Sequence, residues 1–178
     1  MPKRLPSKYD NVLLDKTTKP KEKMTLLATM LHSEKTLTSD FFNFFQSATD
    51  SERGTCMSAL TIIAKEHPKF LVNHIDLIIE QISAKAPRIK WEASECIAEL
   101  APHYPDKVVL AIPRLIKNMG DEGTVARWST ARALTEIAKA NPATHLQLLP
   151  LFEKTIVKEE NNGVRKVYEK AMKSFKKK

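Results

Sequence analysis

The sequence of 178 residues is poor in glycine and in aromatic residues, and it has no long apolar run. Four glycines and 7% aromatic residues argue against a β-sandwich or β-barrel, because such folds need many turns and aromatic strands. No apolar stretch approaches the roughly 18 residues that indicate a membrane span. The basic N-terminal segment, MPKRLPSKYDNV, lacks the apolar core of a secretory signal. We therefore expect no membrane segment and a cytoplasmic location.

Cysteine content and charge narrow the expected class further. Cys56 and Cys96, the only cysteines, lie at apolar positions of helical patterns without metal-ligand spacing, so we expect buried free thiols and no metal site. Lysine and arginine number 29 against 21 acidic residues, which gives a net charge of +8. Such an excess favours an anionic partner such as nucleic acid, although it can also serve solubility alone.

Three segments of the chain align with one another without gaps. They are Arg53–Pro68, Lys90–Pro105 and Arg127–Pro142, and a truncated fourth copy begins at Arg165. The copies repeat the same apolar positions, which are Leu60, Ile97, Leu134 and Met172, and then Ile63, Leu100, Ile137 and Phe175. The i, i+3, i+4, i+7 spacing within a copy predicts an amphipathic helix. A unit of about 37 residues that recurs in this way predicts a repeat fold.

A second helical pattern follows each repeat proline. The segments that carry this pattern after Pro68, Pro105 and Pro142 are FLVNHIDLIIEQI, VVLAIPRLIKNM and LQLLPLFEKTI. Proline is tolerated at the first position of a helix, so each of these prolines can begin one. Pro113 and Pro150 fall at the same place inside these patterns and are expected to bend or restart the helix.

One helix pair cannot bury its own apolar face, so stacked pairs must share a core. We predict an all-α, right-handed α-α superhelix of about 3.5–4 helical-pair repeats. Its repeat domain spans residues 21–178, with units at 38–67, 68–104, 105–141 and 142–178 and one further capping helix at 21–32. Residues 1–20, which are rich in lysine, arginine and proline, are expected to form a basic, loosely ordered arm.

The repeated residues resemble the HEAT-repeat family over residues 38–178. Val125-x-Arg127 followed by Ala131-x-Ala133-Leu134 is similar to the family's "VRxxAAxAL" helix, and Leu148-Leu149-Pro150-Leu151 is similar to its "LLPLL" helix. The resemblance implies a HEAT-like solenoid in which the aligned helices line the concave side. A fold of this kind implies almost nothing about chemistry.

On the side of the aligned helices opposite the core, equivalent positions form one predicted strip. Copy by copy, its members are Gly54, Ser58, Thr61 and Lys65; Trp91, Glu95, Ala98 and Pro102; Trp128, Arg132, Thr135 and Lys139; and Lys166, Lys170, Lys173 and Lys177. Aromatic rings beside lysine and arginine suit a polyanion or an anionic peptide. The predicted binding residues are Trp91, Trp128, Arg127, Arg132, Lys139, Lys166, Lys170 and Lys173. We expect an anionic macromolecule as partner, with nucleic acid favoured over an acidic protein segment, and we expect a monomer without a cofactor.

Each of these residues also has a structural interpretation. The tryptophans can pack against the next unit, and the lysines can form a solvated face or the polar cap of the last repeat. The leading basic residues, Arg53, Lys90, Arg127 and Arg165, can pair with acidic residues of neighbouring turns. The candidates for that ladder are Asp121, Glu122, Glu159 and Glu160.

Few catalytic patterns are present in the sequence. There is no HExxH, P-loop, GxGxxG or nucleophile elbow. The segment Trp91-Glu92-Ala93-Ser94-Glu95 resembles the stretch that carries the catalytic aspartate in HEAT-like alkylpurine DNA glycosylases, with Glu in place of Asp. That resemblance implies that Glu95 stabilises positive charge on a sugar, that Trp91 and Trp128 flank the lesion, and that Arg127 holds a phosphate. We predict a non-catalytic binding module, with a glycosylase-like DNA alkylation repair protein and a protein–protein scaffold as the alternatives.

Overall fold

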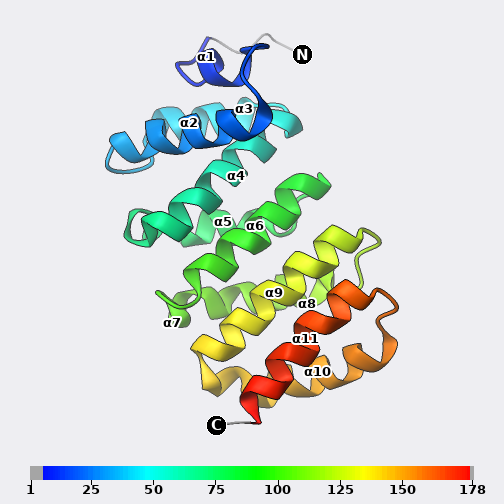
Figure 1. The fold of residues 1–178 in the computed structure, drawn as a ribbon. Helices are drawn as coiled ribbons and strands as arrows, with labels where there is room; N and C mark the ends of the chain where they lie inside the picture. Colours follow the sequence, from blue (N-terminus) through cyan, green and yellow to red (C-terminus); the bar gives the residue numbers. More distant parts are fainter. Residues whose placement is uncertain (1–5, 177–178) are drawn as a thin grey trace.

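A computed structural model describes residues 6–176, which form helices and no β-strand (Figure 1). The α-helices are α1 (Asp10–Leu13), α2 (Pro20–Ser33), α3 (Ser39–Ser47), α4 (Asp50–Glu66), α5 (Ile75–Gln81), α6 (Pro87–Leu100), α7 (Pro105–Val108), α8 (Ile112–Asn118), α9 (Thr124–Ala140), α10 (His145–Lys158) and α11 (Asn162–Phe175). Three short 3-10 helices lie at η1 (Pro68–Leu71), η2 (Val109–Ala111) and η3 (Pro142–Thr144). The all-α prediction is confirmed.

The helices stack in two layers (Figure 1). The front layer contains α2, α4, α6, α9 and α11, in this order from the N-terminal to the C-terminal end of the stack. The back layer contains α3, α5, α8 and α10. Within the front layer α4 packs on α2 and α6, and α9 packs on α6 and α11. Each front helix therefore has a neighbour on both sides, except at the two ends of the stack.

The repeat prolines begin short helical turns and not whole helices. Pro68, Pro105 and Pro142 stand at the first positions of η1, α7 and η3, and the main back helix starts a few residues later. Pro113 lies in the first turn of α8, where the helix restarts as predicted. Pro150 lies inside α10, which runs through it without ending, so the expected restart is wrong there. A unit thus has three parts: a proline-led turn, a back helix and a front helix.

Side-chain caps mark where two of the front helices, α4 and α11, begin. Thr49 precedes α4, where its hydroxyl accepts a hydrogen bond from the Glu52 amide, 3.3 Å away. The Glu52 carboxylate in turn accepts a bond of 2.7 Å from the Thr49 amide. This capping box satisfies two backbone donors that the first turn of a helix leaves free. Asn161 has the same role at α11, accepting from the Val164 amide at 3.1 Å.

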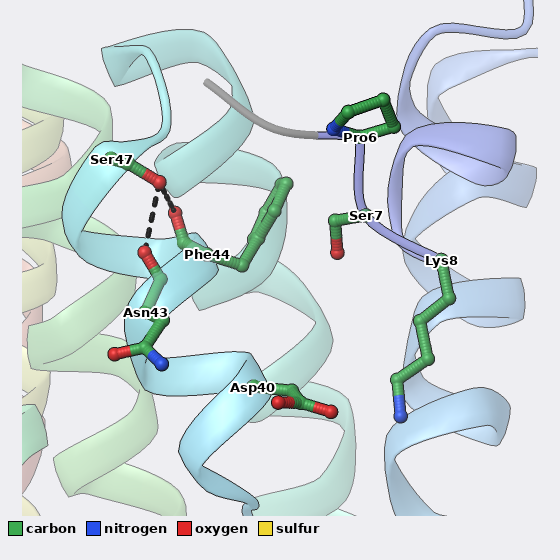
Figure 2. A pocket seen from close by; sticks show the side chains of 7 residues that line it. All are labelled: Pro6, Ser7, Lys8, Asp40, Asn43, Phe44 and Ser47. Carbon is green, nitrogen blue, oxygen red and sulfur yellow. Dashed lines mark hydrogen bonds between the residues drawn. The ribbon is translucent and has the colours of Figure 1, made fainter.

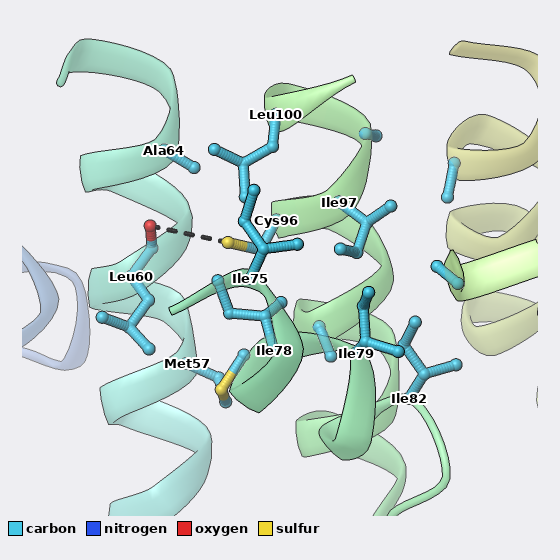
Figure 3. Close-up of a cluster of buried hydrophobic side chains, with 14 of the residues drawn as sticks. Met57, Leu60, Ala64, Ile75, Ile78, Ile79, Ile82, Cys96, Ile97 and Leu100 are labelled. Atoms are coloured by element: carbon cyan, nitrogen blue, oxygen red, sulfur yellow. Dashed lines mark hydrogen bonds between the residues drawn. The ribbon is translucent and has the colours of Figure 1, made fainter. Parts of the chain in front are cut away.

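The shared core lies between the two layers. Figure 3 shows isoleucines of α5, among them Ile78, between the apolar faces of α4 and α6. The repeated apolar positions that include Leu60, Ile97 and Leu134 are fully buried, as the pattern predicted. Cys56 and Cys96 are buried free thiols, which is also confirmed. Burial of one such aliphatic side chain contributes about 2 kcal/mol, so a core continuous across units is the main stabilising term of the stack.

The N-terminal segment packs against the repeat domain. Tyr9 is fully buried, with its ring centroid 5.8 Å from that of Phe41 and 5.1 Å from that of Phe44. Leu13 of α1 is also buried, and the Lys8 ammonium lies 2.8 Å from the Glu34 carboxylate. The prediction of a loosely ordered arm is therefore wrong from residue 6 onward, because two apolar side chains anchor it. Residues 1–5 of the predicted arm lie outside the described residues.

Candidate functional site

The leading basic residues of the repeat bridge successive units. The Arg127 guanidinium donates from Nε to a Glu159 carboxylate oxygen at 2.9 Å, and it also donates to the Asp121 carbonyl at 2.8 Å. One unit earlier, the Lys90 ammonium lies 2.5 Å from the Asp121 carboxylate. These cations hold the pKa of Glu159 and of Asp121 below the usual range through direct hydrogen bonds. The predicted structural ladder is confirmed for this pair of units, and the charge of Arg127 is compensated within the fold.

Arg132 of α9 forms ion pairs with two glutamates of α6. One guanidinium nitrogen lies 2.5 Å from Glu95 and another 2.6 Å from Glu99. All three side chains are largely covered, and burial raises the pKa of Glu95 above its usual value even though Arg132 acts in the opposite direction. Two carboxyl groups face the one guanidinium and compensate its charge within the fold. Arg132 is therefore not a free cation for an anionic ligand.

A second polar cluster joins α6 to α4. Arg88 donates to the Ser58 hydroxyl at 3.2 Å, and that hydroxyl lies 2.6 Å from the Glu92 carboxylate. The Arg88 side chain crosses directly over Gly54, where a Cβ atom would come within 2.8 Å of the Arg88 Cδ. A glycine inside a helix costs about 1 kcal/mol relative to alanine, and here the close approach of Arg88 explains its presence. This cluster is part of the packing between the two front helices.

The two tryptophans of the strip differ in exposure. Trp128 has 40% of its surface exposed and is among the large exposed apolar side chains of the described residues. Trp91, one unit earlier, is only half-buried. Neither indole is sealed beneath other helices, so both can contact a partner. Trp128 offers the larger area.

Part of the predicted strip lies between helices and not on the surface. Ser58, Ala98 and Thr135 have less than 5% of their surface exposed. The Thr61 hydroxyl donates to the backbone carbonyl of Glu92 on the next helix at 3.2 Å, which shows that this side of α4 faces α6. The prediction of exposure at these positions is wrong, because a front helix with neighbours on both sides leaves only a narrow outward stripe.

Among α4, α6, α9 and α11, the excess of basic over acidic residues is largest on α11. Together α4, α6 and α9 carry seven basic and seven acidic residues, whereas α11 carries four basic residues and one acidic residue. Lys166, Lys170 and Lys173 are exposed, and none of the three is in an ion pair with another residue of the range 6–176. Lys139 of α9 is partly neutralised by Glu136, 2.6 Å away. The eight predicted binding residues therefore separate into two compensated arginines, the partly neutralised Lys139, two tryptophans and three unpaired lysines of α11. The last strip member, Lys177, lies outside the described residues.

No catalytic arrangement surrounds Glu95. Its carboxylate is held by Arg132, and burial raises its pKa, which would reduce the negative charge available to stabilise a cationic sugar. Within residues 6–176, no three histidine, cysteine or acidic side chains come together as a metal site would require. The His32 and His67 rings stack with centroids 3.8 Å apart, as a packing contact between the ends of α2 and α4.

The described residues that line the cavity beside the N-terminal segment form no catalytic arrangement either. It is an open hollow of about 650 Å³ between that segment and α3, lined by Pro6, Ser7, Lys8, Asp40, Asn43, Phe44 and Ser47 (Figure 2). The Ser47 hydroxyl donates to the backbone carbonyl of Asn43 at 2.8 Å, so it is not activated by a base. Lys8 is paired with Glu34. The candidate functional surface is therefore the outward side of α9 and α11.

Within residues 6–176, no helix is both long enough and apolar enough to cross a bilayer.

Comparison with known proteins agrees with the fold. No protein-family model matches the chain. A segment of 87 residues, 49% of this chain, is 29% identical to the AP-3 complex subunit delta-1 of Bos taurus, of which it spans only 7%. Among solved structures, the designed armadillo repeat protein YIII(Dq)4CqI superposes with a TM-score of 0.66 over 93% of this chain and 80% of its own, at 17% sequence identity. The chain is thus an α-solenoid of stacked helical repeats, similar in fold to armadillo-type proteins.

Proposed function

We propose that this chain is a non-catalytic scaffold that binds another protein, and that it holds an acidic segment of that partner on α11 and the adjoining side of α9. Lys166, Lys170 and Lys173 supply the charge, and Trp128 supplies an aromatic contact. Lys166 occupies on α11 the place that Trp128 occupies on α9, and neighbouring helix axes lie about 8–10 Å apart. One extended or helical segment can therefore contact both.

The observation that carries the proposal is the contrast between α11 and the other front helices. On α9 both arginines are paired with glutamates, Arg127 with Glu159 and Arg132 with Glu95 and Glu99. On α11 three exposed lysines have no acidic partner among the described residues. Unpaired cations beside a large exposed aromatic ring attract carboxylates and add desolvated contact area.

A protein partner fits this surface better than a nucleic acid does. A long polyanion gains affinity from a track of phosphate-neutralising cations, and α4, α6 and α9 together are electrically balanced. The bovine protein that shares 29% identity over 87 residues is, by its name, a subunit of a protein complex. The charge of +8 also favours nucleic-acid binding, which a comparison of oligonucleotide and peptide affinities can distinguish from protein binding.

The test compares three forms of the full chain by fluorescence anisotropy with a labelled peptide of glutamate and alanine. In the first variant Lys166, Lys170 and Lys173 are replaced by glutamate. In the control variant Lys16, Lys21 and Lys85 are replaced by glutamate; these three exposed lysines lie in loops or in the first turn of a helix, where an acidic residue is tolerated. Circular dichroism checks that helicity is unchanged in both.

We expect the α11 variant to lose peptide binding at least about tenfold while the control keeps it, because three like charges replace three opposite ones. Equal affinity of the two variants would refute the proposed surface. A duplex or single-stranded oligonucleotide that binds more tightly than the peptide, with an affinity that falls steeply with salt and is lost in the α11 variant, would instead support the nucleic-acid hypothesis.

A further inference from the structure

Within residues 6–176, no helix covers one side of the last unit of the stack. In every unit the back helix has a side toward the preceding unit and a side toward the following one. On α10, Lys154, Thr155 and Lys158 line a hollow with Met119 and Gly120 of the preceding unit. The opposite side of α10, which includes Leu149 and Ile156, therefore points away from the preceding unit and toward the open C-terminal end of the stack (Figure 1).

The same positions are apolar in all three units except at Glu153, and four of them are buried in the earlier units. Unit by unit they are Val72, Ile75, Ile79 and Ile82; Val109, Ile112, Ile116 and Met119; and Leu146, Leu149, Glu153 and Ile156. Ile75 and Ile112 have at most 3% of their surface exposed, whereas the equivalent Leu149 is only half-buried. Ile156 is half-buried, as is its counterpart Met119, whereas Ile82 is fully buried. Leu146 is 93% exposed. Val157, close to Ile156 on the same side, is 85% exposed.

The front helix at this end carries charged residues where the earlier front helices have uncharged and mostly buried ones. The positions that face the next front helix are Met57, Thr61 and Ala64 on α4; Ser94, Ala98 and Ala101 on α6; and Ala131, Thr135 and Ala138 on α9. On α11 they become Glu169, Lys173 and Lys176. Another front helix could not pack on α11 as α9 packs on α6 without burying these charges, which is costly. The end face is thus apolar along α10 and mainly basic along α11.

We propose that this end face binds an amphipathic, acidic α-helix of the partner protein, with its apolar side on α10 and its carboxylates against the lysines of α11. The inference rests on the proposed function: it keeps the lysines of α11 as the charged contact and places a further, helical part of the partner on α10, away from Trp128. A helix fits because helical units cover the same apolar positions of α5 and α8 inside the stack. The helix α10 is 14 residues long, so a partner helix of about 14–18 residues can lie along it.

A second copy of the chain does not fit this face. The opposite end of the stack, at α2, exposes Lys16, Lys19 and Lys21, so joining the two ends would bring lysines against lysines. Like charges that meet at an interface disfavour association. The partner must bring the acidic residues.

The test uses two labelled peptides of the same composition and of about 18 residues. One has leucine at i, i+3, i+4 and i+7 positions and glutamate at most others, and the second is a scrambled order without helical periodicity. The proteins are the full chain, a variant in which Leu146 and Val157 are replaced by glutamate, and a control in which Leu110 is replaced by glutamate. All three replaced residues are strongly exposed, so folding is not at risk.

We expect the full chain to bind the amphipathic peptide at least about tenfold more tightly than the scrambled one, since burial of one or two leucine side chains is worth this ratio. The Leu146 and Val157 variant should lose that preference, and the Leu110 control should keep it. Equal binding of the two peptides, together with its loss in the α11 lysine variant, would overturn the helical docking and leave the proposed function standing. Failure of both peptides to bind would overturn both.

Discussion

Replacing Arg132 by methionine should destabilise the fold, because it strands two carboxylates between α6 and α9. The Arg132 side chain is 27% exposed, and Glu95 and Glu99 are 21% and 23% exposed. At an effective dielectric constant of about 20, opposite charges about 4 Å apart attract by about 4 kcal/mol, and desolvation offsets much of that. We expect a net loss of about 2 kcal/mol in the free energy of unfolding at pH 7, below the value for a fully buried pair.

The pH dependence of this loss identifies its cause. Burial already raises the pKa of Glu95, and removal of the guanidinium raises it further. A carboxyl group whose pKa is higher in the folded state than in the unfolded state stabilises the fold below its unfolded pKa and loses that contribution as the pH rises through its folded pKa. The difference between variant and wild type should therefore be largest at pH 7 and should shrink as the pH falls toward about 5.

Urea unfolding followed by circular dichroism from pH 5 to pH 8 measures both effects. Replacing Lys139 by methionine is the matched control, because its pair with Glu136 is more exposed and should contribute little. A second variant that also replaces Glu95 by glutamine should recover part of the stability. A loss below about 0.5 kcal/mol, or a loss that does not vary with pH, would refute the structural role of Arg132.

Three further predictions concern the rest of the stack. Replacing Tyr9 by alanine should cost about 3–5 kcal/mol of local stability. Proteolysis should then cleave the N-terminal segment while the C-terminal units stay resistant, because repeats can unfold separately. Uniform proteolysis along the chain would contradict this. Cys56 and Cys96 are buried, and burial raises the pKa of Cys96, so both should resist a thiol reagent such as dithionitrobenzoate until urea unfolds the chain. Replacing Thr49 by alanine should lower the melting temperature by removing about 1 kcal/mol of capping, and an unchanged melting temperature in calorimetry would argue against the capping box.

The repeat alignment predicted the buried core because the period fixes which side chains lie side by side. Leu60, Ile97 and Leu134 are equivalent in the alignment and are all fully buried. The alignment also indicated the ladder of Arg127, since a basic residue recurs at the start of each front helix and acidic residues recur in the turns. The period predicts these contacts because equivalent positions have equivalent neighbours in every unit of the stack.

The outward surface was less predictable from the sequence. Choosing the side opposite the core places Thr135 on the surface, but a front helix with two neighbours buries its flanks as well. The ion pair of Arg132 with Glu95 joins residues that are 37 positions apart in the sequence. Predicting it requires knowing how the side chains of α9 and α6 are aligned when the two helices pack. The lysines and prolines of the N-terminal segment predict a loosely ordered arm, but the ring of Tyr9 packs on Phe44 and holds the segment against the repeat domain.

The most direct test of the binding surface uses Trp128 as its own reporter. In a variant with Trp91 replaced by phenylalanine, Trp128 is the single tryptophan, and the uncharged quencher acrylamide measures its exposure without bias from the lysines. Saturating amounts of the acidic peptide of glutamate and alanine, which contains no tryptophan, should reduce this quenching, and the effect should vanish when Lys166, Lys170 and Lys173 are replaced by glutamate. A peptide that binds with equal affinity to both proteins and leaves the quenching of Trp128 unchanged would contradict the placement of the partner on α9 and α11.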